Sequence, residues 1–316
     1  MSTQWKRVLA LVVMLIVEST GYAAASEPKI WDTREGRWIT ETDLHARLAT
    51  APLIVLGEIH DHPVHHRIQT RLIEGLARQG PPRTLLLEML TTEEQPALAN
   101  YLREHPTDAG ALGAEVQWEE RGWPDWSLYR PVVQAALDAR MPLAPADLPR
   151  GIIKQVAKDG IDVLAPEVQA ELAIETAFPA PLEDALAALL SAAHCDALPP
   201  TALPGMVAAQ HVRDAYMARQ LLTRATAGGG VLLTGNGHLD RRWGVPAFVR
   251  RQADDTEVTT VALIETAAED PAPALSASSG YDFIWFTEPR HRAEDPCAAF
   301  RAMQTTGPGN ALTEKR

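Results

Sequence analysis

Residues 53–60 (LIVLGEIH) decide the fold, because four consecutive apolar residues run directly into glycine, glutamate and histidine. A short run that is apolar at every position is typical of a strand covered on both faces, as in a parallel sheet. Similar β-rich runs recur along the chain at 84–90 (TLLLEML), 142–148 (PLAPADL), 230–235 (GVLLTG), 259–265 (TTVALIE) and 282–287 (DFIWFT). Together they predict a mostly parallel central sheet.

Helical spacing fills the intervals between these strands. Pro63 suits the first position of a helix over 63–79, and Thr91 and Thr92 with Glu94 and Gln95 resemble a capping box that opens a helix to about residue 104. Further helices are expected over 130–140, 149–158, 166–190 and 204–226.

The alternation of strands and helices predicts an α/β fold in which helices flank the sheet. The Ala-rich stretch at about 150–228 contains no convincing strand, so we expect a helical insertion or subdomain there. The α/β domain is expected over 26–290, followed by a C-terminal tail over 291–316.

Composition sets the protein class. The chain has 316 residues, of which 46% are hydrophobic and 22% charged, as in an ordinary globular protein. A formal net charge of −12 argues against a nucleic-acid partner, because no basic footprint dominates. With only two cysteines, the chain is neither a disulfide-dense scaffold nor the holder of a four-cysteine zinc site.

Residues 1–25 have the pattern of a cleavable signal peptide. Lys6 and Arg7 precede an apolar run over 8–17 that is too short to cross a bilayer, and three alanines end the segment before Ser26. We therefore expect a periplasmic protein that does not span the membrane after processing; a retained anchor is the alternative. In an oxidising compartment Cys195 and Cys297 can form a disulfide, against the alternative of two unrelated buried thiols.

Ionisable side chains collect where the predicted strands end. The carboxyl ends of parallel strands meet at one edge of a sheet, so these strands deliver two glutamates, two histidines and Asp147 to one rim. We expect four of these residues to line one site: Glu58, His60, Glu88 and His238. Each residue also has a plainer explanation: Glu58 could cap the next helix, and Gly235-Asn236-Gly237 could be an ordinary turn. Each of these explanations accounts for one residue, and they explain less well why so many ionisable residues follow predicted strands.

Two helices add polar candidates. His66 and Gln69 are expected to face inward. His62 and His65 could simply be exposed at the start of a helix. His62 and His66 lie one helical turn apart, which is also a spacing that suits a metal. On a later helix, Gln210, Arg213, Asp214 and Met217 share one side and predict a buried polar network, with a surface ion pair as the alternative. Aromatic residues near 118–129 and 281–286 could wall a flat ligand, although core filling is their commoner role.

Several segments in order resemble the ChaN-like haem-binding uptake proteins, a branch of the group that includes Tiki, TraB and erythromycin-esterase-like proteins. The resemblance covers roughly residues 28–290. It rests on GEIHDHPVHHRIQ (57–69), LLLEML (85–90), DWSLYRP (125–131), ADLPRG (146–151), HCDALP (194–199), MVAAQHVRDAYMARQL (206–221), TGNGHLDRRWGVP (234–246) and YDFIWFTEP (281–289).

The resemblance implies two classes of function. The resemblance implies that haem is bound through a tyrosine helped by a histidine, in dimers that hold two haems face to face. The candidate ligands here are Tyr129, Tyr216 and Tyr281, and His66 and Arg213 are further candidates for cofactor binding. The lipid anchor of the ChaN-type relatives does not carry over, because no cysteine precedes Cys195. In the hydrolytic relatives, two Gly-x-x-His motifs and a glutamate match His60, His238 and Glu88.

The favoured hypothesis is an exported haem- or iron-binding homodimer that acts in uptake or storage, since a phenolate suits ferric haem. The alternative is a peptidase or esterase in which His60 and His238, with Glu58 or Glu88, hold Mn, Co or Zn while the remaining carboxylate acts as general base. Without a metal, His60 backed by Glu88 could activate water directly. A non-catalytic partner-binding protein is the third possibility.

Overall fold

The structure, a computed structural model, describes residues 29–269, 271, 280–292, 295 and 297–298. The expected signal peptide and most of the expected tail lie outside the described residues. Among the helices of the described part, none is long and apolar enough to cross a membrane.

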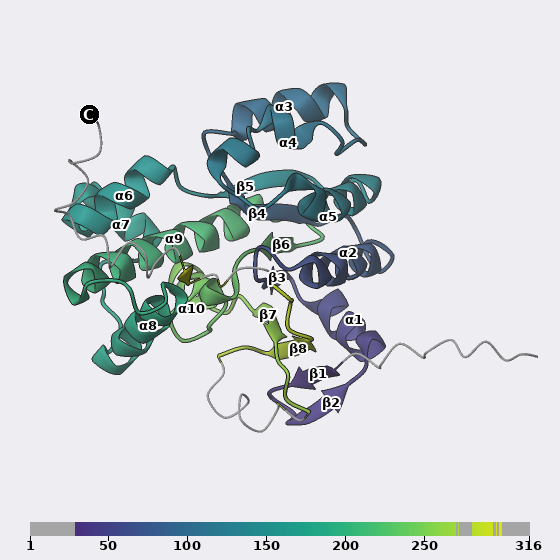
Figure 1. The fold of residues 1–316 in the computed structure, drawn as a ribbon. Helices are drawn as coiled ribbons and strands as arrows, with labels where there is room; N and C mark the ends of the chain where they lie inside the picture. The colour runs from purple at the N-terminus through teal and green to yellow at the C-terminus, as the bar shows by residue number, and fades with distance from the viewer. Residues whose placement is uncertain (1–28, 270, 272–279, 293–294, 296, 299–316) are drawn as a thin grey trace, which may run out of the picture.

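One eight-stranded sheet, with helices on both faces, organises the described residues (Figure 1). Its strand order is β2-β1-β8-β7-β3-β6-β4-β5, and the six strands from β8 to β5 run parallel. All six lie where the sequence predicts strands: β3 (Leu53–Leu56), β4 (Thr84–Thr91), β5 (Leu143–Asp147), β6 (Gly230–Leu233), β7 (Val258–Glu265) and β8 (Phe283–Thr287). The α/β prediction is therefore confirmed.

An antiparallel hairpin, which the sequence analysis did not predict, extends the sheet at one edge. Strand β1 (Lys29–Asp32) pairs antiparallel with both β8 and β2 (Arg37–Ile39). Gly36, at φ 62°, lies in the turn between β1 and β2, in the left-handed region that glycine adopts without strain.

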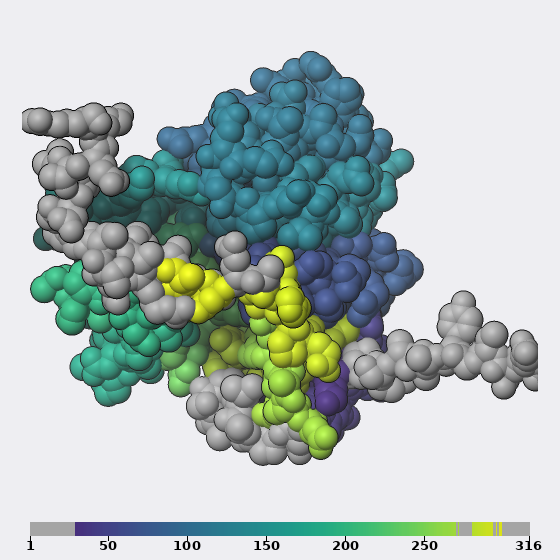
Figure 2. All heavy atoms as spheres, viewed as in Figure 1, coloured from purple at the N-terminus to yellow at the C-terminus, as the bar shows by residue number. Residues whose placement is uncertain are grey.

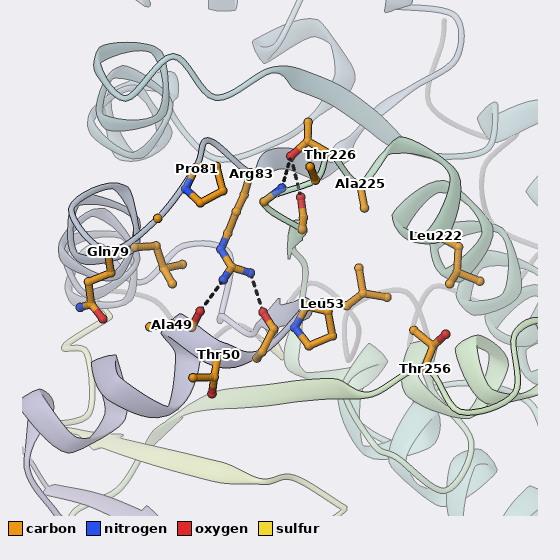
Figure 3. A pocket seen from close by; sticks show the side chains of 17 residues that line it. Ala49, Thr50, Leu53, Gln79, Pro81, Arg83, Leu222, Ala225, Thr226 and Thr256 are labelled. Carbon is orange, nitrogen blue, oxygen red and sulfur yellow. Dashed lines mark hydrogen bonds between the residues drawn. The ribbon is translucent and has the colours of Figure 1, made fainter.

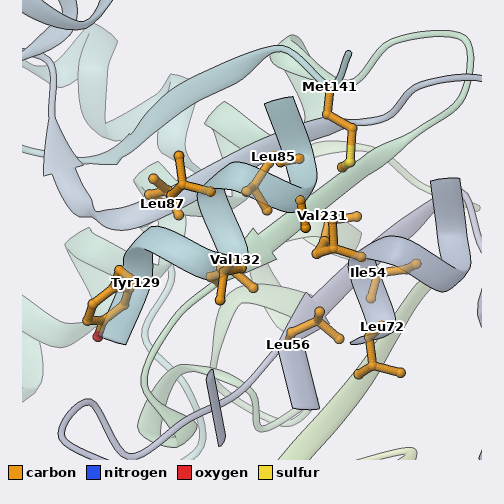
Figure 4. Close-up of a cluster of buried hydrophobic side chains, with 14 of the residues drawn as sticks. Ile54, Leu56, Leu72, Leu85, Leu87, Tyr129, Val132, Met141 and Val231 are labelled. Atoms are coloured by element: carbon orange, nitrogen blue, oxygen red, sulfur yellow. The ribbon is translucent and has the colours of Figure 1, made fainter. Parts of the chain in front are cut away.

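Successive residues of each strand pack against opposite layers of helices. On β3, Ile54 and Leu56 belong to one core cluster, whereas Leu53 and Val55 belong to the other. Figure 4 shows part of the first core, where Leu72 and Val132 lie against the strand residues. The first layer includes α1 (Glu41–Thr50), α2 (Pro63–Ala77) and α5 (Trp126–Asp138); the second includes α6 (Arg150–Asp159), α9 (Leu203–Arg224) and α10 (Val245–Gln252).

Helix ends correct two predictions. Glu94 accepts hydrogen bonds from the backbone and hydroxyl of Thr91, but this closes a turn ahead of α3 (Gln95–Glu104) and does not open the helix. The single helix expected over 166–190 is two helices, α7 (Pro166–Leu172) and α8 (Ala180–Ala193). Ala173 adopts left-handed φ after α7, and Pro179 disfavours a continuous helix before α8.

The regular structure between β5 and β6 consists of the helices α6, α7, α8 and α9 and short 3-10 turns. One further short helix, α4 (Leu112–Glu115), precedes β5. Cys195, just after α8, forms a disulfide with Cys297, with 5.6 Å between the Cα atoms. Figure 2 shows the described C-terminal residues, in yellow, crossing the surface from β8 toward the green helical segment.

Candidate functional site

The first polar cluster forms around Glu58, directly after β3. This carboxylate is 2% exposed, and it accepts hydrogen bonds from the Tyr129 hydroxyl (2.5 Å) and the Gln69 amide (2.8 Å). His60 Nδ1 lies 2.7 Å from Glu58 Oε1. Burial alone would raise the pKa of Glu58, but His60, His66 and Tyr129 outweigh it and lower the pKa. Glu58 is thus an ionised, fully bonded carboxylate.

The second cluster forms around Glu88 in β4. One carboxylate oxygen accepts from the Thr234 hydroxyl (2.6 Å) and the Gly235 amide (2.7 Å), and the other from Arg213 (2.5 Å). Arg213 also donates twice to Asp147 Oδ2, at 2.6 and 2.8 Å. Despite burial, His238 and Arg213 hold the pKa of Glu88 well below its usual range. Arg213 therefore joins the ends of β4 and β5 through two buried carboxylates.

His238 connects α9 to this second cluster. Its Nδ1 donates to Asp214 Oδ1 at 2.6 Å, and its Nε2 lies 3.4 Å from Glu88 Oε1. Burial lowers the pKa of His238, but Glu88 and Asp214 outweigh burial and raise it to about 9. Burial raises the pKa of Asp214 to about 6, against the opposing effect of His238.

His60 lies between the two clusters. Its Nε2 is 4.0 Å from Glu88 Oε2, and a Cβ on Gly235 would lie 3.0 Å from the same nitrogen. Burial lowers the pKa of His60, but Glu58 and Glu88 outweigh burial and raise it. With 32% of its side chain exposed, it is the most accessible of these imidazoles and carboxylates. The strand ends thus bring together all five of the ionisable residues that the sequence placed there.

The same geometry does not favour a metal centre. Within the described ranges, no group of three or more His, Cys, Asp or Glu side chains is arranged to hold a metal ion. The expected ligands His60, His238 and Glu88 are instead engaged with one another and with Arg213, whose positive charge already compensates Glu88. The arrangement gives the metal-dependent hydrolase no support.

His62 and His65, whose role the sequence left open, are buried and organise the loop that carries His60. His62 Nδ1 accepts from the Val64 amide at the start of α2, and His65 Nδ1 accepts from the Ile59 amide at 2.9 Å. Their rings stack with centroids 4.0 Å apart. His66, 2% exposed, instead contacts the His60 backbone carbonyl.

Sequence reasoning missed Thr234, a fully buried threonine that donates to Glu88. A threonine that ends an apolar strand is common, so one sequence carries no signal for this role. Gln69, Asp214 and Arg213 were singled out by their helical spacing, and the structure places all three in contact with the strand-end residues.

A comparison with protein families decides what the chain is. The family model described as "Haem-binding uptake, Tiki superfamily, ChaN" matches residues 44–249, which is more than half of the chain. The chain belongs to this ChaN family. The family assignment confirms the resemblance that the motifs indicate, and it makes haem the ligand that the family supports.

A solved structure supports the fold. A structure described as cofacial haem binding to ChaN of Campylobacter jejuni matches with a TM-score of 0.66 and 23% identity, covering 82% of this chain and 96% of that one. The type III effector HopBA1 gives a TM-score of 0.43 and 12% identity, covering 85% of this chain and 100% of that one. A search of curated proteins finds no match.

Two of the three candidate tyrosines do not suit haem iron. Tyr129 is completely buried and donates its hydroxyl to Glu58, and burial together with Glu58 raises its pKa far above the usual value. Tyr281 packs beside Ile284 and Phe286, and burial raises its pKa to about 12 with Asp240 adding to the effect. It lines none of the main cavities found among the described residues.

Tyr216 differs because it lines a cavity of about 490 Å³ between α6, α7 and α9. The walls are largely apolar, from Leu148, Ile152, Leu164, Val168 and Leu172. A tyrosine that lines a groove with apolar walls is a donor type and a setting that fit ferric haem in this ChaN-family chain. Neither His66 nor Arg213 lines this groove.

The largest of these cavities, about 570 Å³, lies at the opposite end of the sheet, where β3, β4 and β6 begin (Figure 3). Its arginine, Arg83, already donates to the carbonyls of Ala49 and Ala51 at 3.0 and 2.6 Å. These hydrogen bonds connect the end of α1 to the start of β4, so the Arg83 guanidinium has a structural role.

Proposed function

We propose that this ChaN-family protein binds ferric haem with Tyr216 as the iron ligand, in the groove between α6, α7 and α9. The observation that carries the proposal is that Tyr216, alone among the three candidate tyrosines, lines a cavity of ligand size with apolar walls. When bound, the haem supplies the iron that the phenolate ligates. The chain supplies the ligand oxygen, the apolar walls and the charges around them.

Cationic side chains at the groove suit the carboxylates of a haem. Arg219 and Arg224 line the same cavity, and Arg219 is paired with Glu171 at 2.6 Å. Arg224 makes only a side-chain hydrogen bond to Gln220, so its charge is available to an anion. Val168, 39% exposed, adds apolar surface at the groove.

We further propose that the protein works in the periplasm, in haem or iron uptake or storage, as a homodimer. The signal-peptide pattern of residues 1–25 supports export, and the Cys195–Cys297 disulfide supports an oxidising compartment. The dimer is suggested by the Campylobacter jejuni relative, whose structure is described as binding haem cofacially. Sedimentation of the haem-loaded protein tests it: a mass that stays monomeric on loading contradicts the homodimer.

Titration of the chain with ferric haem, followed in the Soret band, tests the ligand. Burial raises the pKa of Tyr216, so the free protein carries a phenol that must lose a proton when it binds iron. We expect saturable binding whose affinity increases with pH between 6 and 8, by up to about tenfold per unit. Tyr216→Phe should abolish that pH dependence and most of the affinity, while Tyr281→Phe serves as the matched control. An unchanged titration of Tyr216→Phe contradicts the assignment.

A further inference from the structure

A second cavity, of about 290 Å³, opens at the carboxyl ends of β4 and β5 and is separate from the Tyr216 groove. Ligands of open α/β folds bind at this end of the strands. Four cationic side chains line the cavity, together with the carboxylates of Glu88 and Asp147: Arg121, Arg150, Lys154 and Arg213. A concentration of cations is unexpected in a chain whose formal net charge is −12.

The ion pairs leave two of these cations without an acidic partner. Glu88 and Asp147 are both compensated by Arg213, and Arg121 lies 3.3 Å from Glu94. Arg150 donates only to the carbonyl of Arg121.

Lys154 is exposed, and none of the salt bridges among the described residues includes it or Arg150. Two of the four positive charges at this cavity, those of Arg150 and Lys154, therefore have no acidic partner in the described structure.

Trp123 supplies the aromatic part of the cavity wall. Its indole ring contacts His60 edge-on at 5.0 Å, and the Arg150 guanidinium lies 5.9 Å from the ring centroid. The Trp123 Nε1 is buried and has no hydrogen-bond partner in the described structure. A buried N–H without an acceptor costs free energy.

We propose that this cavity binds a small organic anion, whose carboxylate or phosphate group is held by Arg150 and Lys154 and whose flat or apolar part lies against Trp123. Guanidinium groups recognise carboxylate and phosphate oxygens with paired hydrogen bonds, and the lysine adds a point charge. The volume limits the ligand to a small metabolite. The proposal does not depend on haem binding, because no residue except Leu148 lines both cavities.

Calorimetric titration of the whole protein at low ionic strength tests the site, with inorganic phosphate, phenyl phosphate and benzoate as probes. We expect saturable binding of phenyl phosphate or benzoate that is stronger than that of inorganic phosphate, because only the aromatic probes reach Trp123. The variant R150Q/K154Q should weaken it by about tenfold or more. The control R130Q/K158Q removes the same charge from exposed positions outside the cavity and should bind as the parent does.

Three results overturn the proposal. The first is that none of the probes binds saturably. The second is that R130Q/K158Q weakens binding as much as R150Q/K154Q, which would reduce the effect to net charge. The third is that haem displaces phenyl phosphate and R150Q/K154Q abolishes the Soret shift, which would make the cavity part of the haem site. A parent protein that binds phenyl phosphate and ignores haem would instead refute the haem proposal alone.

Discussion

Replacing Arg213 with methionine perturbs the centre of the polar network. Arg213 is 21% exposed, whereas the two carboxylates that it neutralises, Glu88 and Asp147, are 2% and 9% exposed. Removing one partner of a buried ion pair leaves an uncompensated charge and costs roughly 3 to 5 kcal/mol. Because the arginine is partly hydrated, we expect the lower end, with a free energy of unfolding reduced by about 3 kcal/mol.

Equilibrium urea unfolding at pH 7 measures this change. Arg213→Met/Glu88→Gln removes one of the stranded charges, so it should recover about 1 to 2 kcal/mol relative to Arg213→Met. Arg219→Met is the matched control, since its pair with Glu171 is 40% and 53% exposed and should cost less than about 1 kcal/mol. The reasoning is refuted if Arg213→Met costs no more than Arg219→Met, or if the second substitution gives no recovery.

Three further changes test other parts of the structure by the same unfolding assay. Cys195→Ser/Cys297→Ser opens a cross-link between residues 102 apart and should cost roughly 2 to 5 kcal/mol. The pKa of His238 is raised from 6.5 to about 9, so its stabilisation is complete below pH 6.5 and is lost as pH rises through 9; His238→Gln should remove this decline, of about 2 to 3 kcal/mol. Gly57→Ala should cost roughly 1 to 3 kcal/mol, because its Cβ would lie 2.1 Å from Asn236 Oδ1.

Each of these changes has a control. A reducing agent should lower the stability of the parent but not of the serine double variant; equal sensitivity contradicts the disulfide account. His105→Gln alters an exposed imidazole and should keep the alkaline decline that His238→Gln loses. Gly151→Ala adds its Cβ in open space on α6 and should be neutral or stabilising; a cost equal to that of Gly57→Ala would deny the close packing at Gly57.

The sheet could be predicted because its six parallel strands are apolar at most positions, several of them without interruption, and the site could be placed because such strands end at one edge. The β1–β2 hairpin could not be predicted, because strands of four and three residues are too short to show a clear alternation of apolar and polar residues. Its turn also needs only one glycine, Gly36, and 20 glycines are spread along the chain.

The sequence could not predict which side chains of the site contact one another. Helical spacing indicates that Arg213 and Asp214 face the site, but not that Arg213 reaches Glu88, 125 residues away. The three tyrosines are equivalent as residue types, and they differ only in burial and in what surrounds the hydroxyl. The Tyr129 hydroxyl donates a hydrogen bond to Glu58, whereas Tyr216 lines a groove.

Resonance Raman spectroscopy of the ferric haem complex tests the central claim most directly, because it detects the bond between iron and a phenolate oxygen. The account predicts an iron–phenolate vibration in the parent protein that persists in Tyr129→Phe and Tyr281→Phe and disappears in Tyr216→Phe. A spectrum without phenolate ligation, or one that Tyr216→Phe leaves unchanged, would contradict the account.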